Sequence, residues 1–315
     1  MVNMGNHIGP QLQAPRTETI AGFLGKILLF ARTKPLAILA MAVLILMGIV
    51  ALMADFVATH DPLTQNAAEI LRPPGFDHYF GTDGAGRDIF SRVVHGSRVS
   101  LYIGFLAMGL ASVVGTFVGT ASAYLGGIFD LIVQRVIDVL LGFPFLVLAL
   151  IMVVALGSSP TSVAIAIALA QAPQIARLSR ATAFLINAEP YMDAARASGA
   201  GSYRIIWRHL MPNSFSPVLA QVTGYFGAAV AAETALSFLG LGVPPPFPSL
   251  GRMLQEAVRQ YFEVAPWATI FPGMALSLIV VSAALLGDAI RDLLDPRHVL
   301  PRRARSNDSH AGGAS

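Results

Sequence analysis

The chain has 315 residues, of which 55% are hydrophobic and only 12% are charged. Soluble domains carry about 25% charged residues, so a soluble enzyme is not indicated. The chain has no cysteine, which excludes disulfides, thiolate metal sites and cysteine nucleophiles. The net charge is +3, and the basic residues stand beside apolar blocks, as in membrane proteins rather than nucleic-acid-binding proteins. Composition therefore predicts one integral membrane domain.

Charge-free runs predict where the chain crosses the membrane, because about 20 apolar helical residues span a bilayer. Five such runs occur, and the one between Asp138 and Arg177 is too long for a single helix. The turn residues from Gly157 to Pro160 divide it into two helices joined by a tight hairpin. We therefore expect an all-α membrane protein with six transmembrane helices, at about residues 36–56, 100–123, 140–157, 160–184, 216–240 and 267–287.

The distribution of lysine and arginine predicts the orientation of these helices. Fifteen basic residues fall on the side of the two termini and six on the other side. The positive-inside rule then places both termini and the loop 185–213 in the cytoplasm, and the loop 57–99 outside. We expect a cytoplasmic tail over residues 1–35, a transmembrane domain over 36–298 and a disordered cytoplasmic tail over 299–315.

Side-chain patterns also predict several packing contacts. Gly115, Gly119 and Ala123 follow one another at four-residue spacing, which allows a second helix to approach closely. Arg135 and Asp138 are three residues apart, and we expect them to form a local ion pair. After the last span, acidic and basic residues in helical register predict ion pairs at the membrane exit or with the loop 185–213; they are Asp288, Arg291, Asp292 and Asp295.

Motifs for energy conversion or catalysis are absent from the sequence. The two lysines, Lys26 and Lys34, do not lie in a GxxxxGK setting, so no P-loop is present, and the glycines of GTDGAGRD do not form GxGxxG. HExxH and GxSxG are also absent, and every histidine falls outside the predicted spans. We therefore expect no catalytic residue and no cofactor on this chain.

Two histidine–aspartate neighbours on the outer side could hold a divalent metal, namely His60–Asp61 and Asp77–His78. Loop residues of this kind are more often solvated, so the sequence favours no metal site. Glu233 is the only acid inside a predicted span and lies near its outer end. An ion-coupling role and a structural hydrogen bond between helices both fit such a residue.

The loop 185–213 is alanine-rich and helix-forming, and it carries apolar residues that no membrane covers. Gly199 and Gly201 permit a bend. Tyr203, Ile206 and Trp207 have the i, i+3, i+4 spacing of anchors that dock a helix in a groove. We expect Met211-Pro212 to end this helix. The alternative is a helix that folds back onto the chain's own bundle.

This loop resembles the cytoplasmic EAA loop of ABC importer permeases. Asp193-Ala194-Ala195 stands in the place of EAA, Gly199 at the following glycine, and His209, Met211 and Pro212 at the final I, L and P. Asp for Glu keeps the charge and Met for Leu keeps the apolar volume. Histidine at the isoleucine position is typical of the dipeptide/oligopeptide/nickel permease family.

An outer segment, FGTDGAGRDIFSRVVHGSRVSLYIG at 80–104, is similar to the GTDxxGRDxxSRxxxGxRxSL signature of that family. Further stretches resemble its C-type subunit, and together they cover about residues 35–298. One departure is Leu250, where the family often has tryptophan. By their chemistry, the residues of this segment form turns, helix caps and ion pairs in an outer gate or lid, and substrate contact by the charged ones is the alternative. They are Gly81, Asp83, Gly86, Arg87 and Asp88.

The resemblance implies a type I ABC importer permease-like fold in the bacterial inner membrane. It implies a pore subunit that moves peptides or related small solutes delivered by an extracytoplasmic binding protein. The partners would be a second permease subunit and two cytoplasmic ATPase subunits, which would bind the ATP and Mg. Coupling to the ATPases would fall to Asp193, Ala194, Ala195, Gly199, Tyr203, Trp207, His209, Met211 and Pro212. A channel or secondary carrier that works without a motor is the rival interpretation.

Overall fold

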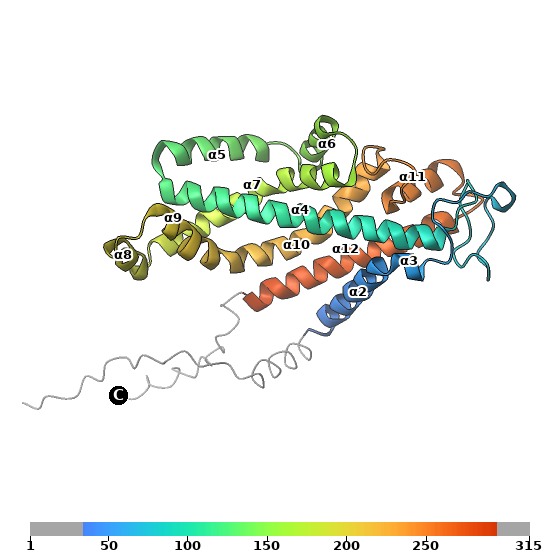
Figure 1. The fold of residues 1–315 in the computed structure, drawn as a ribbon, viewed down its shortest axis with the longest axis horizontal. Coiled ribbons are helices and arrows are strands. Elements are labelled where there is room, and N and C mark those ends of the chain that lie inside the picture. Colours follow the sequence, from blue (N-terminus) through green and yellow to red (C-terminus); the bar gives the residue numbers. More distant parts are fainter. Residues whose placement is uncertain (1–33, 295–315) are drawn as a thin grey trace, which may run out of the picture.

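The computed structural model describes residues 34–294, and these residues are almost entirely helical. Within this range no strand forms, and Thr82 and Asp88 make an isolated antiparallel bridge. The helices lie along one long axis as an elongated bundle (Figure 1). The two predicted tails fall outside the described residues, apart from positions 34 and 35, and so does Asp295.

The helices follow one another along the chain with short connections, except for the long loop before α4. In chain order they are α2 (Pro35–Leu52), α3 (Ala54–Val57), the 3-10 turn η1 (Ala67–Glu69), α4 (Ile89–Leu125), α5 (Gly127–Leu141), α6 (Phe145–Leu156), α7 (Pro160–Asn187), α8 (Pro190–Ala197), α9 (Ser202–Ile205), the π-helical turn η2 (Ile206–Leu210), α10 (Met211–Phe238), α11 (Leu250–Gln260) and α12 (Trp267–Leu294).

Three of the described helices, α2, α4 and α12, are long and apolar enough to cross a membrane. Two bent pairs raise this number to five if each is one span: α5 with α6, and residues 202–215 with 217–238. Helix α7 is as long, but Gln171, Arg177 and Arg180 lower its hydropathy. The fold is thus an all-helical membrane fold, while the number of six spans and their orientation stay predictions.

Helix α4 begins eleven residues earlier than the predicted span at residue 100. Its start is fixed by Asp88, whose side chain accepts a hydrogen bond from the backbone N–H of Ser91 at 2.8 Å. Counting uncharged residues missed this part, because Arg92 and Arg98 lie within the first turns of the helix. The helix therefore extends from the apolar bundle into the outer loop.

The predicted third span, 140–157, is wrong in its first part. Helices α5 and α6 meet at a bend of 98° around Gly142 and Pro144, because a proline cannot continue the helix before it. The predicted pair of Arg135 with Asp138 is also replaced, because α5 lies against α7 and Arg177 pairs with Asp138 there. The hairpin after α6 forms as expected, with Gly157 at a φ of 84°.

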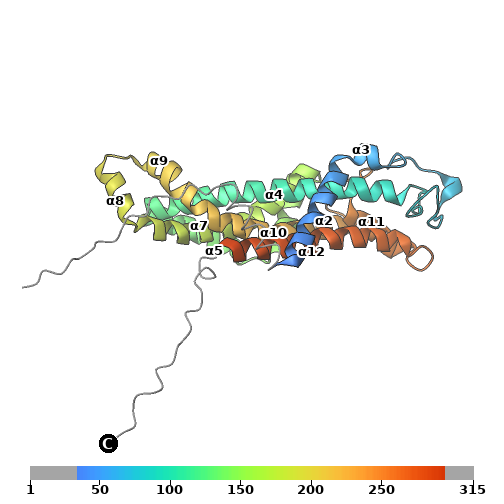
Figure 2. The same cartoon turned by 90° about the horizontal axis from the view of Figure 1, so that it is seen from below.

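Close packing of α4 against α7 confirms the prediction drawn from the small residues of α4. A Cβ on Gly115 would lie 2.8 Å from the carbonyl oxygen of Ala172, and one on Gly119 would overlap the carbonyl oxygen of Ala176. Helix α10 packs against α12 and α4, and α2 lies across α12 (Figure 2). Lys34 pairs with Asp292 at 2.5 Å, so the acidic end of α12 meets the start of α2 rather than the loop 185–213.

Met211-Pro212 begins a helix instead of ending one, contrary to the sequence prediction. The π-helical turn η2 runs directly into α10, and Pro212 stands in the first turn of α10. The backbone N–H of Met211 bonds to the oxygen of Ile206, five residues back, in the wider spacing of a π-helical turn, and Pro212 follows directly after this turn. The helix that was predicted over 216–240 therefore starts at Met211 and is continuous with the preceding segment.

Candidate functional site

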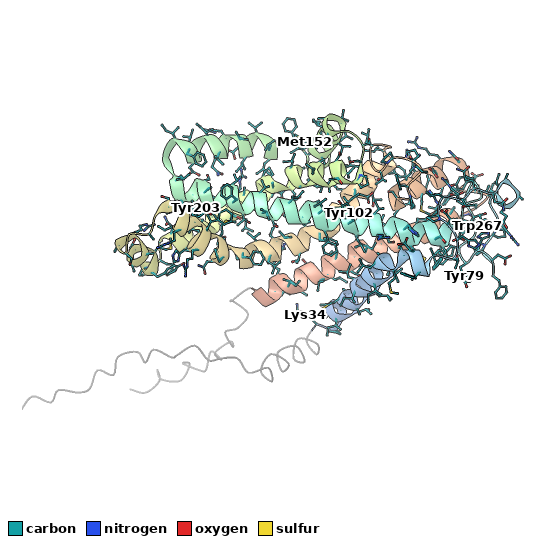
Figure 3. All side chains as sticks on the ribbon, in the orientation of Figure 1. Lys34, Tyr79, Tyr102, Met152, Tyr203 and Trp267 are labelled. Atoms are coloured by element: carbon teal, nitrogen blue, oxygen red, sulfur yellow. The ribbon has the colours of Figure 1, made fainter. Side chains whose placement is uncertain are left out.

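The predicted functional residues gather at two opposite ends of the bundle. Helices α8 and α9 form one end, and the loop 58–88 with α11 forms the other (Figure 1). Tyr203 and Trp267 mark the two ends when side chains are drawn (Figure 3). We call the first region, residues 188–213, the coupling end, and the second, residues 58–92 with 249–267, the outer end.

One face of the coupling end packs on the chain's own bundle. Met192, Ile205 and Leu210 are fully buried, in a cluster with Ala123 of α4 and Ala183 of α7. Ile206 joins this cluster and is 8% exposed, so it is not the free docking anchor that its spacing suggested. The coupling end is therefore attached to the tips of α4 and α7.

The opposite face of the coupling end is open. Asp193 and Ala194 are exposed, and Ala195 is half-buried. Tyr203 and Trp207 remain 77% and 46% exposed, although Trp207 also contacts the Phe117 ring of α4 at 5.8 Å between centroids. Folding back onto the bundle, one of the two alternatives drawn from the sequence, is thus realised on one face, and docking of the exposed face on a partner stays a prediction.

Gly199 produces the bend between α8 and α9. Its φ is 78°, a conformation that costs an L-residue with a side chain roughly 1–2 kcal/mol. No atom of the described chain lies within 4 Å of the place where a Cβ would stand. The glycine is therefore required by the backbone turn, and the space in front of it is free.

Polar contacts in the coupling end are local. Asp193 accepts a hydrogen bond from Arg196 at 2.7 Å, three residues along the same helix. Asn213 donates to the backbone oxygen of His209 at 2.6 Å, and His209 lies near the Tyr191 ring, with 6.3 Å between centroids. Pro212 is exposed and Met211 is half-buried. All nine predicted coupling residues thus lie in this one region.

At the outer end, Asp83 organises the loop before α4. It is 4% exposed and accepts hydrogen bonds from the backbone N–H groups of Ala85 and Arg87 at 2.9 and 3.0 Å. Its other oxygen receives Arg87 Nε at 2.7 Å and lies 3.4 Å from Arg92 Nε. Asp83 is thus a buried partner of two arginines, as the capping and pairing interpretation predicts.

Arg87 extends this network to α11. Its guanidinium donates to Glu256 at 2.9 Å, and Glu256 also accepts from Arg252 at 2.9 Å. Arg87, Glu256 and Tyr261 line a polar cavity of about 420 Å³. Burial, and then the nearby Asp83 carboxylate, raises the pKa of the Tyr261 hydroxyl above its ordinary value of 10, so the phenol stays neutral. The i, i+4 spacing of Arg252 and Glu256 signals their mutual pair, but not the contact with Arg87.

Two glycines allow the outer loop to close on itself. Gly81 has a φ of 74°, and a Cβ on it would lie 2.6 Å from the backbone oxygen of Arg72. Gly86 has a φ of 70°, and a Cβ there would overlap the backbone of Asn66. Both need glycine for conformation and for close approach. The predicted turn function of Gly81 and Gly86 is confirmed.

Asp88 and His78 form a contact that the sequence did not suggest. His78 is 5% exposed, and its Nδ1 lies 2.8 Å from the Asp88 carboxylate, while its Nε2 lies 3.3 Å from Glu69. The hydrogen bond from His78 lowers the pKa of Glu69 below its ordinary value. The expectation that His78 is a solvated neighbour of Asp77 is wrong, because Asp77 pairs with Arg72 instead.

Glu233 lies within the bundle and is fully buried. It accepts hydrogen bonds from the hydroxyls of Ser100 on α4 at 2.7 Å, Ser237 on α10 at 2.8 Å and Ser249 before α11 at 3.1 Å. These contacts connect three elements. They match the structural alternative that the sequence left open, a hydrogen bond between helices.

Comparison with known proteins gives consistent matches. A model of the binding-protein-dependent transport system inner membrane component matches residues 89–299. A model of the N-terminal TM domain of oligopeptide transport permease C matches residues 29–74. The two models together cover α2, the long helices, the coupling end and the outer end apart from residues 75–88.

Among individual proteins, a dipeptide transport system permease protein of Alkalihalophilus pseudofirmus is 38% identical over 266 residues, 84% of this chain and 87% of that protein. A probable D,D-dipeptide transport system permease protein of Escherichia coli K12 is 35% identical over 291 residues, 92% and 97% of the two chains. An inward-facing structure of the MetNI methionine ABC transporter has a TM-score of 0.51 at 17% identity and covers 65% of this chain and 96% of that one. This last likeness concerns the fold alone.

Proposed function

Because the chain belongs to the inner membrane components of binding-protein-dependent transport systems, we propose that it forms half of the pore of an ABC importer for peptides or related small solutes. Membership makes it a multi-pass inner-membrane permease subunit. The peptide class is supported by relatives that are named dipeptide permeases and match more than four fifths of the chain.

The partners in this proposal are a second permease subunit, two cytoplasmic ATPase subunits and an extracytoplasmic binding protein. ATP and Mg would bind to the ATPase subunits, in keeping with the lack of a P-loop in this sequence. Six membrane crossings over 36–298 with both termini in the cytoplasm complete the proposal. They place the coupling end at the ATPases and the outer end at the binding protein.

The coupling mechanism rests on one observation, which is that one face of the coupling end is exposed while the opposite face packs on the bundle. The open face, with Asp193, Ala194 and Tyr203, is available to an ATPase groove. The buried face is held by α4 and α7, and η2 continues into α10. Closure of the ATPase dimer would displace α8, and the attached long helices would move with it between outward and inward openings.

Purification of the tagged protein from its own membranes in mild detergent tests this proposal. We expect a second permease and two ATPase subunits to co-purify, with ATPase activity in the sample. A stable chain that purifies alone and transports in ATP-free vesicles would overturn it in favour of a channel or secondary carrier.

The coupling step has a separate test in Gly199→Trp. The indole would occupy the free space in front of the bend, and the strain at the positive φ costs only roughly 1–2 kcal/mol in this local turn. The variant should therefore stay inserted in the membrane and keep the second permease but lose the ATPase subunits and uptake. Gly157→Trp is the matched control, because Gly157, in the hairpin after α6, is also exposed, has a φ of 84° and has no atom of the described chain within 4 Å of its Cβ position. Normal uptake by Gly199→Trp would contradict coupling through this surface.

A further inference from the structure

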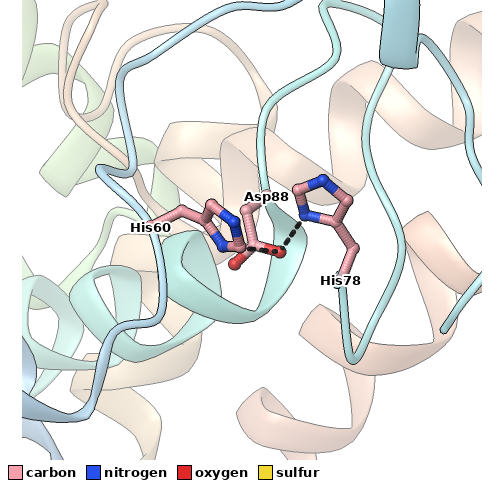
Figure 4. A group of neighbouring side chains, drawn as sticks. All are labelled: His60, His78 and Asp88. Carbon is pink, nitrogen blue, oxygen red and sulfur yellow. Dashed lines mark hydrogen bonds and ion pairs between the residues drawn. The ribbon is translucent and has the colours of Figure 1, made fainter. Parts of the chain in front are cut away.

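Three side chains with metal-binding atoms meet at the outer end. His60 comes from the segment after α3, His78 from the middle of the outer loop and Asp88 from the start of α4 (Figure 4). Their ligand atoms all lie within 4.8 Å of one another. The sequence offered each histidine its neighbouring aspartate as a partner, whereas the fold brings both histidines to a third, distant carboxylate.

The two oxygens of Asp88 have different surroundings. Oδ2 accepts the backbone N–H of Ser91 at 2.8 Å and caps α4, and it lies 3.4 Å from the Thr59 hydroxyl. Oδ1 faces Nδ1 of His78 at 2.8 Å and Nδ1 of His60 at 3.9 Å. Helix capping therefore leaves Oδ1 for the two imidazoles, in a position that is almost fully buried.

Glu69 contacts the nitrogen of the His78 ring that faces away from Asp88. Its Nε2 lies 3.3 Å from the Glu69 carboxylate, which can only accept a hydrogen bond when ionised. With Nε2–H donated to Glu69, the lone pair of Nδ1 points towards Asp88 Oδ1. At 2.8 Å the two atoms share a proton, and a bound metal ion can take the place of that proton. A carboxylate behind the imidazole is also the usual support of a metal-binding histidine.

The position of His60 indicates which cation fits. Its ring lies 4.6 Å from the His78 ring between centroids, tilted by 32°. A proton on His78 would satisfy Asp88 and Glu69. It would, however, leave Nδ1 of His60 at 3.9 Å from Asp88 Oδ1, with the Thr59 hydroxyl as its hydrogen-bond partner. A metal ion accepts lone pairs from two neutral imidazoles and one carboxylate together.

We propose that His60, His78 and Asp88 bind a divalent transition metal of the zinc class, with Glu69 orienting His78. Two imidazoles and one carboxylate are a set that zinc accepts, and a water molecule would complete four ligands. The ion would tie residues 58–88 to the start of α4. Its role is structural, and it does not depend on the identity of the transported solute.

Metal binding by the purified importer tests the site directly. After chelator treatment and dialysis, zinc titration should show one bound ion per chain that His60→Asn removes. His60 is exposed, so this variant should fold. His95→Asn is the matched control, since His95 lies on the same outer end of α4 but contacts Asp55. Zinc binding equal in wild type and His60→Asn, or no binding in wild type, would overturn the proposal.

Two further readouts separate a built site from loose surface binding. Glu69→Gln keeps the three ligands and should weaken zinc binding about 10–100-fold, as expected for loss of a supporting carboxylate. Cobalt in place of zinc should give the intense visible absorption of a four-coordinate site. Zinc should raise the unfolding temperature of the wild type and of His95→Asn but not of His60→Asn, and the absence of this shift in the wild type would refute the structural role.

Discussion

The two ends of the bundle satisfy their polar groups in opposite ways. At the outer end, Asp83 and Arg92 are buried and pair with each other and with residues from other elements. At the coupling end, Asp193 is exposed, and its partner Arg196 lies one turn away on the same short helix. Asp83 and Arg92 thus find their partners within this chain, whereas the coupling end presents a surface that a second protein can cover.

This difference matches what an importer subunit needs from each end. A buried network connects the outer loop to α4, α11 and α12. A short helix with one open face and one face packed on α4 and α7 has the contacts that the proposed coupling requires. The comparison predicts that substitutions at the outer end affect stability, and those at the coupling end affect transport.

The largest effect should come from Asp83→Ala. This change leaves the buried Arg92 without its carboxylate, and loss of one partner of a buried pair costs about 3–5 kcal/mol of unfolding free energy. Thermal unfolding in detergent should show a large decrease in midpoint. Asp77→Ala is the control, because Asp77 is an exposed residue of the same loop. Equal midpoints for the two variants would contradict the assignment of a buried network.

Between the two ends, the contact of α4 with α7 should give the next largest effect. Gly119→Ala places a Cβ against the backbone of Ala176, and such overpacking costs about 1–3 kcal/mol. Gly109→Ala on the same helix meets no atom of the described chain within 4 Å and should be neutral or slightly stabilising. If both variants unfold at the same temperature, α4 and α7 do not approach as closely as the structure shows.

Local signals in the sequence predicted much of this arrangement. The spacing of Gly115 and Gly119 predicted that a second helix packs closely on α4, though not that it would be α7, and the turn residues from Gly157 predicted the hairpin after α6. Asp88 had the residue type and position of a helix cap. The motif at Asp193 located the coupling end, because that prediction needs only residues that are close in sequence.

Contacts between distant segments could not be predicted in the same way. The link from Arg87 to Glu256 crosses 169 positions, and the pair of Arg177 with Asp138 depends on how α5 lies against α7. The meeting of His60 with His78 depends on the path of the outer loop. Helical spacing also made Ile206 resemble an exposed anchor, because spacing does not tell which face the bundle covers.

A smaller effect is expected at Glu233, between the two ends. Glu233→Gln keeps an oxygen acceptor but turns an amide N–H₂ towards serine hydroxyls, and we expect a loss of about 1 kcal/mol, the net value of one hydrogen bond. Thermal unfolding and uptake should be measured together. A structural role predicts a small decrease in midpoint with uptake retained. Loss of uptake without any change in stability would instead indicate ion coupling.

The smallest stability effect is expected for Asp193→Ala, which repeats the aspartate-to-alanine change at the coupling end. The residue is exposed, and losing its ion pair and its place in the first helical turn should cost only about 0.5 kcal/mol. Uptake and ATPase retention should nevertheless fall, and Asp193→Glu should preserve both because it keeps the charge. Asp83→Ala would then lose mainly stability, and Asp193→Ala would lose mainly transport. If Asp193→Ala left uptake unchanged, the open face of α8 would be solvent-exposed surface without a partner. The two ends would then differ in how deeply their polar groups are buried, and not in function.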